Sequence, residues 1–196
     1  MADWIALGDR AIRFARPARS ARALLRAIRA WPGVVDVVVA RTDVAAYFAG
    51  EPRVDPAWIA ALATAPDDPD PGREIAIPAA YAGPDLDSVA AALGRHRDDV
   101  SALHAGAIYT VETMGFAPGF AYLAGLPPAL ELPRRTTPRT RVPAGSIAIA
   151  GLHTAVYPFD SPGGWHLIGT VRGVGVVMFG PDGPLLQLGD RVRFVP

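Results

Sequence analysis

The chain has 196 residues, 51% of them hydrophobic, so it is long enough to form one domain or two small ones around a packed core. Its net charge is zero, which argues against a basic nucleic-acid surface. The absence of cysteine excludes disulfides and cysteine metal sites, and the absence of lysine excludes Schiff-base and P-loop lysine chemistry. No apolar run approaches the roughly 20 residues of a membrane span and no secretory signal is visible, so we expect a cytoplasmic protein.

The first third of the chain has the pattern of an α/β unit, with the order strand, strand, helix, strand, strand, helix. Alternation and helical spacing of apolar residues predict a hairpin over Trp4–Ala15, a helix over Ala18–Ala30, strands over Val34–Ala40 and Val44–Phe48, and a helix over Pro56–Ala63. Ser20 is expected to open the first helix, because a serine hydroxyl can accept from the free N–H groups of the first turn. The β-branched run Val34–Ala40 is expected to be a buried strand.

A polar stretch rich in proline and aspartate, Ala65–Gly72, predicts a linker. The chain then restarts with a predicted strand over Arg73–Pro78. Two short helices are expected next, over Asp85–Leu93 and Arg97–His104. Asp85 is expected to act as the N-cap of the first of these helices.

Beyond Ala107 the pattern is all β, with short strands separated by glycine and proline turns. Strands are predicted over Ile108–Met114, Ser146–Ala150, His166–Thr170, Val174–Phe179 and Arg191–Val195. Many short strands with regular turns are typical of a β-barrel or a β-sandwich.

Three motifs in this β half contain more glycine, proline, arginine and aromatic residues than ordinary packing requires. They are GFAPGFAYL (Gly115–Leu123), PRRTTPRTRVPAGSIAIAG (Pro133–Gly151) and YPFDSPGGWHLIG (Tyr157–Gly169). Glycine allows a close backbone approach, proline pre-sets turns, and arginine presents a planar fork of donors. The combination favours a shaped binding surface.

The first motif is interpreted as a backbone nest with an aromatic wall for a small ligand. The alternative is a tight barrel corner that is lined by core aromatics. The candidate ligand-binding residues in this motif are Gly115, Phe116, Pro118, Gly119, Phe120 and Tyr122.

The second motif contains the densest cationic cluster of the chain, formed by Arg134, Arg135, Arg139 and Arg141. Such a cluster can capture a substrate carboxylate or an ATP phosphate, and the alternative is a solvated loop face. Arg134, Arg135 and Arg139 are the candidate substrate- or nucleotide-binding residues.

The third motif places adjacent glycines with free N–H groups before a tryptophan and a histidine. Such amides can hold an oxyanion, and Trp165 can form a pocket wall. His166 is the candidate catalytic residue, as an acid or base near neutral pH, with a structural role as the alternative. The other candidate binding residues here are Ser161, Gly163 and Gly164.

Four other interpretations fail on the sequence. Asp160 and Ser161 do not form a hydrolase triad with a histidine, because the chain has no G-x-S-x-G elbow. The four histidines lack metal-ligand spacing, so no metal is expected. There is no Walker A loop, so any ATP site is non-standard or shared with a partner. The helix pair over Asp85–His104 is not expected to bind DNA, because its aspartates would repel the phosphates.

The three motifs resemble the KipI/PxpB family, formerly called allophanate hydrolase subunit 1 and described as carboxyltransferase domain, subdomains C and D. Shorter stretches along the whole chain support the resemblance: Leu7-Gly8-Asp9, Pro32-Gly33-Val34, Ile77–Leu86, Leu103-His104 and Leu188–Phe194. The resemblance implies an α+β chain. It would have an N-terminal ββαββα (DCoH-like) domain over residues 1–66, a linker over 67–72 and a cyclophilin-like β-barrel over 73–196.

Members of this family mostly resemble the B subunit of bacterial 5-oxoprolinase, which opens 5-oxoproline to glutamate at the expense of ATP. The resemblance therefore implies a hydrolase that acts on a cyclic amide together with C-type and A-type subunits and is inactive alone. ATP would be a co-substrate, bound with or by the partners. The alternative is a regulatory protein that binds and inhibits a histidine kinase. A standalone prolyl isomerase is a third option that rests on fold analogy alone.

Overall fold

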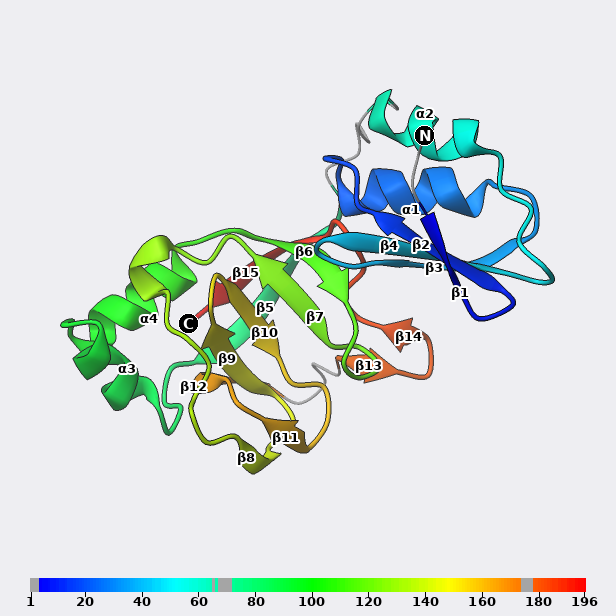
Figure 1. Ribbon diagram of the computed structural model, residues 1–196. Helices are drawn as coiled ribbons and strands as arrows, with labels where there is room; N and C mark the ends of the chain where they lie inside the picture. Colours follow the sequence, from blue (N-terminus) through cyan, green and yellow to red (C-terminus); the bar gives the residue numbers. More distant parts are fainter. Residues whose placement is uncertain (1–3, 65, 67–71, 174–177) are drawn as a thin grey trace. The chain divides into compact units, whose positions relative to one another are not determined.

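The computed structural model describes residues 4–64, 66, 72–173 and 178–196 (Figure 1). The chain divides into two compact units, one made of residues 1–71 with Glu112–Met114, and the other of Gly72–Val111 with Gly115–Pro196. Of the predicted linker over 67–72, only Gly72 lies within the described residues. The first four residues of the predicted strand Val174–Phe179 also lie outside them.

The first unit is a four-stranded antiparallel sheet with two helices, in the predicted order ββαββα. The strand order is β1-β2-β4-β3, and Figure 1 shows both helices on the same side of the sheet. Ser20 accepts a hydrogen bond from Ala23 N at 3.2 Å, which confirms its capping role. The elements are β1 (Trp4–Leu7), β2 (Ala11–Ala15), α1 (Ala21–Arg29), β3 (Val34–Val39), β4 (Asp43–Phe48) and α2 (Pro56–Thr64). The likeness of this unit to DCoH stays a prediction.

The predicted strand over Val34–Ala40 is confirmed as β3, but the prediction that it is buried was wrong. Val37 and Val39 are buried, whereas Val35 and Val38 are 64% and 39% exposed. The physical reason is that the helices cover only one face of the sheet (Figure 1), so side chains on the other face stay exposed. A continuous β-branched run therefore does not distinguish a strand covered on both faces from a strand covered on one.

The second unit is built around a closed barrel, with the strand order β10-β7-β6-β15-β5-β12-β9. Closure decides between the two predicted alternatives in favour of a barrel, and this barrel fits the cyclophilin-like fold that the resemblance implied. The barrel strands are β5 (Glu74–Ala80), β6 (Tyr109–Met114), β7 (Ala121–Ala124), β9 (Ser146–Ala150), β10 (His153–Val156), β12 (His166–Val171) and β15 (Arg191–Val195).

Smaller elements surround the barrel and position its loops. The helices α3 (Leu86–Ala92) and α4 (Arg97–Ala105) pack together, α3 against β12 and α4 against β15. The loop strands β8 and β11 pair with one another, as do β13 and β14. These elements are β8 (Arg139–Val142), β11 (Ser161–Gly163), β13 (Phe179–Gly180), β14 (Gly183–Pro184) and a 3₁₀ turn, η1 (Pro128–Leu130).

Candidate functional site

A small pocket opens in the second unit where the three glycine-rich motifs meet. Its volume is about 80 Å³, which is far below that of a typical site for a drug-sized ligand. It therefore accommodates only one end of a small molecule. The pocket is lined by Phe116, Phe120, Tyr122, Arg134, Tyr157, Gly163, Gly164 and Trp165. All of these except Tyr157 are among the residues that the sequence singled out.

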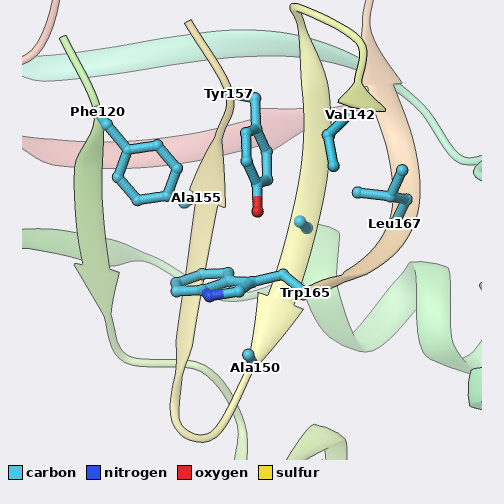
Figure 2. Packing of buried hydrophobic residues seen from close by; sticks show 8 residues of the cluster. Phe120, Val142, Ala150, Ala155, Tyr157, Trp165 and Leu167 are labelled. Carbon is cyan, nitrogen blue, oxygen red and sulfur yellow. The ribbon is translucent and has the colours of Figure 1, made fainter. Parts of the chain in front are cut away.

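The wall of this pocket is a set of aromatic rings packed edge to face (Figure 2). The ring centroid of Phe120 lies 5.0 Å from that of Tyr122, 5.3 Å from that of Tyr157 and 5.8 Å from that of Trp165. Phe120, Tyr157 and Trp165 also belong to one buried core cluster. The same rings thus pack the barrel core and face the pocket, and ligand binding by the first motif stays a prediction. Their burial makes the wall rigid.

Phe116 stands at the pocket with an unusual backbone. Its φ is +73°, and among the described residues it is the one non-glycine residue with a positive φ. Its side chain is also 61% exposed, although its ring contacts that of Phe120 at 5.2 Å. A bulky residue in the left-handed region carries strain, and such strain is concentrated at functional sites.

The hydroxyl of Tyr157 lies against Gly163. A Cβ atom at Gly163 would lie 2.2 Å from the Tyr157 oxygen, so only glycine permits this approach. Burial raises the pKa of the Tyr157 hydroxyl, and the charges of Arg134 and Arg139 and the backbone N–H of Trp165 only partly offset that effect. The phenol therefore keeps its proton at neutral pH and can donate a hydrogen bond.

We expect Gly163→Ala to lower the free energy of unfolding by about 1–3 kcal/mol, as overpacking of a filled core does. Tyr157 cannot move aside, because it is 2% exposed and is held by the surrounding rings. The matched control is Gly164→Ala, since a Cβ there would meet its nearest neighbour, Pro138 Cγ, at an ordinary 3.6 Å. Urea denaturation of both variants measures the difference. Equal stabilities would contradict the close approach at Gly163.

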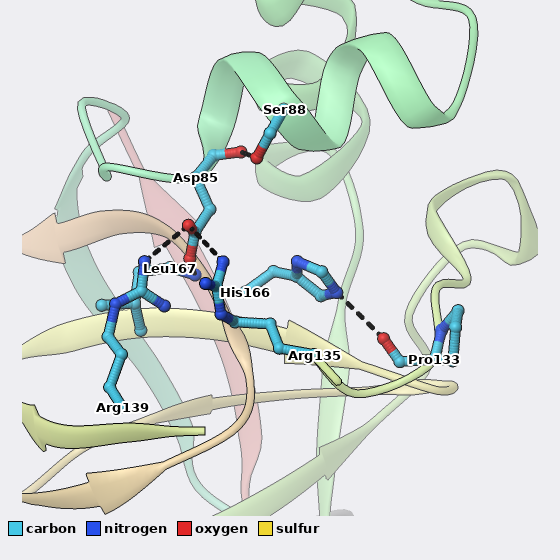
Figure 3. A network of polar contacts seen from close by, with 7 residues as sticks. All are labelled: Asp85, Ser88, Pro133, Arg135, Arg139, His166 and Leu167. Atoms are coloured by element: carbon cyan, nitrogen blue, oxygen red, sulfur yellow. Dashed lines mark hydrogen bonds and ion pairs between the residues drawn. The ribbon is translucent and has the colours of Figure 1, made fainter. Parts of the chain in front are cut away.

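Two of the predicted arginines are bound to a buried carboxylate (Figure 3). Arg135 Nη1 and Arg139 Nη2 donate to Asp85 Oδ1 at 2.9 and 2.6 Å. The backbone N–H of Leu167 donates to Asp85 Oδ2 at 2.7 Å. Burial by itself would raise the pKa of Asp85, but the hydrogen bonds from Arg139 and Leu167 and the two positive charges outweigh burial and lower the pKa. Asp85 is therefore ionised throughout the neutral range.

The predicted arginine cluster is thus divided among different roles. Arg134 lines the pocket, whereas Arg135 and Arg139 are outside its lining and form ion pairs with Asp85. Arg141 pairs with Asp160 and is 77% exposed. The backbone of Arg135 also donates to Gly164 O at 2.8 Å, which ties the arginine loop to the pocket wall. Of the three arginines that were predicted to bind an anion, Arg134 is therefore the one that lines the pocket, and anion binding itself stays a prediction.

The remaining predicted residues lie outside the pocket lining. His166 Nε2 donates to Pro133 O at 2.9 Å, so its ring holds the start of the arginine loop (Figure 3). Ser161 lies on β11, with an Oγ atom that is buried without a partner among the described residues. Gly115, Pro118 and Gly119 form the turn before β7, and a Cβ atom at Gly119 would lie 2.9 Å from Met178 O.

Sequence reasoning missed Tyr157 and misjudged Asp85. Tyr157 stands at the head of the third motif, but nothing local indicates that its ring turns into the pocket. Asp85 does precede α3 as expected, yet its side chain makes no capping hydrogen bond, because the two arginines and Leu167 N–H occupy it. No local signal in the sequence indicates this network, because Asp85 lies 50 and 54 positions from the two arginines.

Within residues 4–64, 66, 72–173 and 178–196, no group of three or more histidine or acidic residues could hold a metal ion. In that same part of the chain, none of the helices has the length and apolar character needed to cross a membrane.

Comparison with known proteins identifies a family. Residues 6–182 match the carboxyltransferase domain, subdomain C and D. The B subunit of 5-oxoprolinase from Haemophilus influenzae is 46% identical over 127 residues, which make up 63% of this chain and 60% of that protein. The protein of the same name from Escherichia coli O157:H7 is 49% identical over 130 residues, 63% of this chain and 58% of that protein. The matched region thus spans about three fifths of the length of these curated relatives.

A solved structure resembles the chain over nearly its whole length. The crystal structure of TTHA0988 in space group P212121 superposes with a TM-score of 0.79 at 38% sequence identity. The match covers 95% of this chain but only 40% of that one. The fold described above is therefore one part of a longer chain in that relative.

Proposed function

This chain belongs to the family of the carboxyltransferase domain, subdomains C and D, and on that premise we propose that it is the B subunit of an ATP-dependent 5-oxoprolinase. Such an enzyme opens 5-oxoproline to glutamate while ATP is hydrolysed to ADP and phosphate. The observation that carries the proposal is the identity of 46% and 49% with two proteins that are each named as the B subunit of 5-oxoprolinase. The regulatory alternative, inhibition of a histidine kinase, is not favoured by these comparisons.

The pocket supports a role in holding a compact cyclic ligand. Phe120, Tyr122 and Trp165 provide flat apolar walls for a small ring, and Arg134 provides a positive charge beside them. Gly163 and Gly164 bring the backbone close to the same space. In this proposal His166 is a positioning residue, because it acts through the Pro133 carbonyl next to Arg134.

The composition of the chain supports dependence on partners. It has no lysine, no cysteine and no Walker A loop, so it lacks the usual means of handling ATP by itself. The pocket of about 80 Å³ also holds only part of a ligand. We propose that a C-type subunit completes the site, that an A-type subunit is also required, and that ATP is bound with or by these partners.

We expect the purified chain alone to form no glutamate from 5-oxoproline and ATP. Turnover should appear when the cognate C-type and A-type subunits are added. Formation of glutamate and of ADP, followed together by chromatography, measures the reaction. Robust turnover by the chain alone would contradict the need for partners. Failure of the complete set to turn over 5-oxoproline would contradict the proposed activity.

A further inference from the structure

The position of Tyr157 in the pocket is unusually well fixed. Its ring is 2% exposed and packs edge to face against Phe120 at 5.3 Å. Figure 2 shows its hydroxyl pointing along the face of the cluster toward Trp165. Because the ring cannot turn, the position of the hydroxyl oxygen is fixed against Gly163, which lines the same pocket.

This hydroxyl is available as a hydrogen-bond donor. The backbone N–H of Trp165 and the charge of Arg134 act on the phenolic oxygen, which keeps its own hydroxyl proton. Burial keeps the hydroxyl protonated. Its own proton is thus left to be donated, and the pocket is the space that the oxygen faces.

The charge around this donor is positive. Arg134 lines the same pocket, and the charges of both Arg134 and Arg139 act on the Tyr157 hydroxyl. Three guanidinium groups, those of Arg134, Arg135 and Arg139, are set against one carboxylate, that of Asp85, which leaves two net positive charges. The matching partner is an anion with hydrogen-bond acceptors only.

A carboxylate fits these donors better than a phosphate chain does. One guanidinium and one phenol provide donors in two directions, which matches the two oxygens of a carboxylate. A space of about 80 Å³ with aromatic walls suits a single small group beside a ring. A triphosphate would require more cations than Arg134, since Arg135 and Arg139 already bind Asp85.

We infer that Tyr157 and Arg134 together bind the carboxylate of the substrate, and that this pair makes the site select cyclic amides that carry a carboxylate over neutral ones. The inference rests on the proposed function and assigns Tyr157 as a specificity-determining residue. The carboxylate would accept one hydrogen bond from the Tyr157 hydroxyl and others from the Arg134 guanidinium. The amide ring would then lie against the aromatic wall.

The test uses calorimetric binding of three probes to the full chain in complex with the cognate C-type subunit, which we propose completes the site. 5-Oxoproline has both a carboxylate and a lactam, cyclopentanecarboxylate has only the carboxylate, and 2-pyrrolidinone has only the lactam. We expect the two carboxylates to bind at least about 10-fold more tightly than 2-pyrrolidinone, as charged hydrogen bonds require. Tyr157→Phe should weaken the carboxylates about 10-fold and Arg134→Ala about 100-fold, while the affinity for 2-pyrrolidinone stays unchanged.

Two control variants separate this role from a structural one. Tyr47→Phe removes an exposed phenol of the first unit, and Arg141→Ala removes an exposed guanidinium of the same loop, so neither should change binding. A purely structural effect of Tyr157→Phe would weaken all three probes equally, which would overturn the inference. Equal binding of the three probes to the wild-type complex, or no binding of either carboxylate, would also overturn it.

The reconstituted complex distinguishes this inference from the proposed function. If the complex converts 5-oxoproline, Tyr157→Phe should raise its KM about 10-fold with little change in kcat. Unchanged kinetics in that variant would refute the carboxylate pair while leaving the activity intact. If the complex does not convert 5-oxoproline, the proposed activity fails, and the three-probe binding experiment alone decides on the pair.

Discussion

Replacing Asp85 by alanine is expected to lower the free energy of unfolding by about 3–5 kcal/mol, the usual cost of removing one partner from a buried ion pair. The Asp85 side chain is 5% exposed and accepts from Arg135, from Arg139 and from the Leu167 backbone. Its removal would leave these donors unpaired and two guanidinium groups facing one another. Asp85→Asn keeps the shape but loses the charge, so we expect a smaller loss. Urea denaturation followed by tryptophan fluorescence and by circular dichroism measures the change.

The control for Asp85 is Asp87, two residues later in the chain. Its side chain is 79% exposed and pairs with Arg97 at 3.3 Å. An exposed pair of this kind contributes about 0–1 kcal/mol, so Asp87→Ala should change stability little. If the two alanine variants lost equal stability, the buried network would not have the importance that its geometry indicates. The Asp85 variant should also bind carboxylates less tightly, because Arg135 and its neighbour Arg134 share one loop.

Acid is expected to destabilise the second unit through a buried histidine. His104 at the end of α4 is fully buried, and its ring packs against those of Tyr109 and Phe194, with centroids 5.2 and 4.7 Å away. Its Nε2 lies 2.8 Å from Thr154 Oγ1 and its Nδ1 lies 2.8 Å from the hydroxyl of Tyr81. Burial lowers the pKa of His104 to about 3.

The neighbours of His104 assign its neutral tautomer. Thr154 Oγ1 donates its own proton to Ala148 O at 3.0 Å, so it must accept from the imidazole. Nε2 therefore carries the hydrogen, and Nδ1 accepts from the Tyr81 hydroxyl. Protonation of Nδ1 would require the Tyr81 hydroxyl to turn and accept instead of donating, and it would place a positive charge in a fully buried position.

The sign of the pH effect follows from the two states of His104. In the folded protein His104 stays neutral down to about pH 3, whereas in the unfolded chain it takes up a proton below about pH 6.5. The unfolded state therefore binds more protons between pH 6.5 and pH 3, and stability falls as pH falls through that window. The limiting slope is about 1.4 kcal/mol per pH unit, which amounts to roughly 5 kcal/mol over the whole window.

Urea denaturation at pH 7, 6, 5 and 4.5 tests this expectation. The pKa of Asp85 is lowered, so the stability that its negative charge contributes is lost only below about pH 4, outside this range. His104→Gln should be less stable at pH 7, because it loses the ring contacts, but its stability should depend much less on pH. His96→Gln is the control, since His96 is exposed and its loss should leave the pH dependence as in the wild type. A wild-type stability that is flat from pH 7 to 4.5 would contradict the prediction.

Local signals were sufficient for most of the helices and longer strands. Helical spacing, capping by Ser20 and turn residues act within a few positions, and the order ββαββα follows from them. The strands β7, β8, β10 and β11 were not predicted. They have only three or four residues each, which is too short for alternation to be read, and glycine and proline flank them. The exposure of one face of β3 could not be predicted either, because burial depends on what covers a strand.

The sequence by itself indicated which segments form the candidate site, since all eight lining residues lie in the three motifs and all of them except Tyr157 were candidate binding residues. Only the tertiary structure decided the partners. Barrel closure pairs β5 with β15 in parallel although more than 100 residues separate them. It also brings Asp85 to arginines 50 and 54 positions away and turns Tyr157 toward the pocket. Hydrophobic periodicity and turn chemistry are properties of neighbouring residues, whereas ion pairs and pocket walls depend on which loops meet in space.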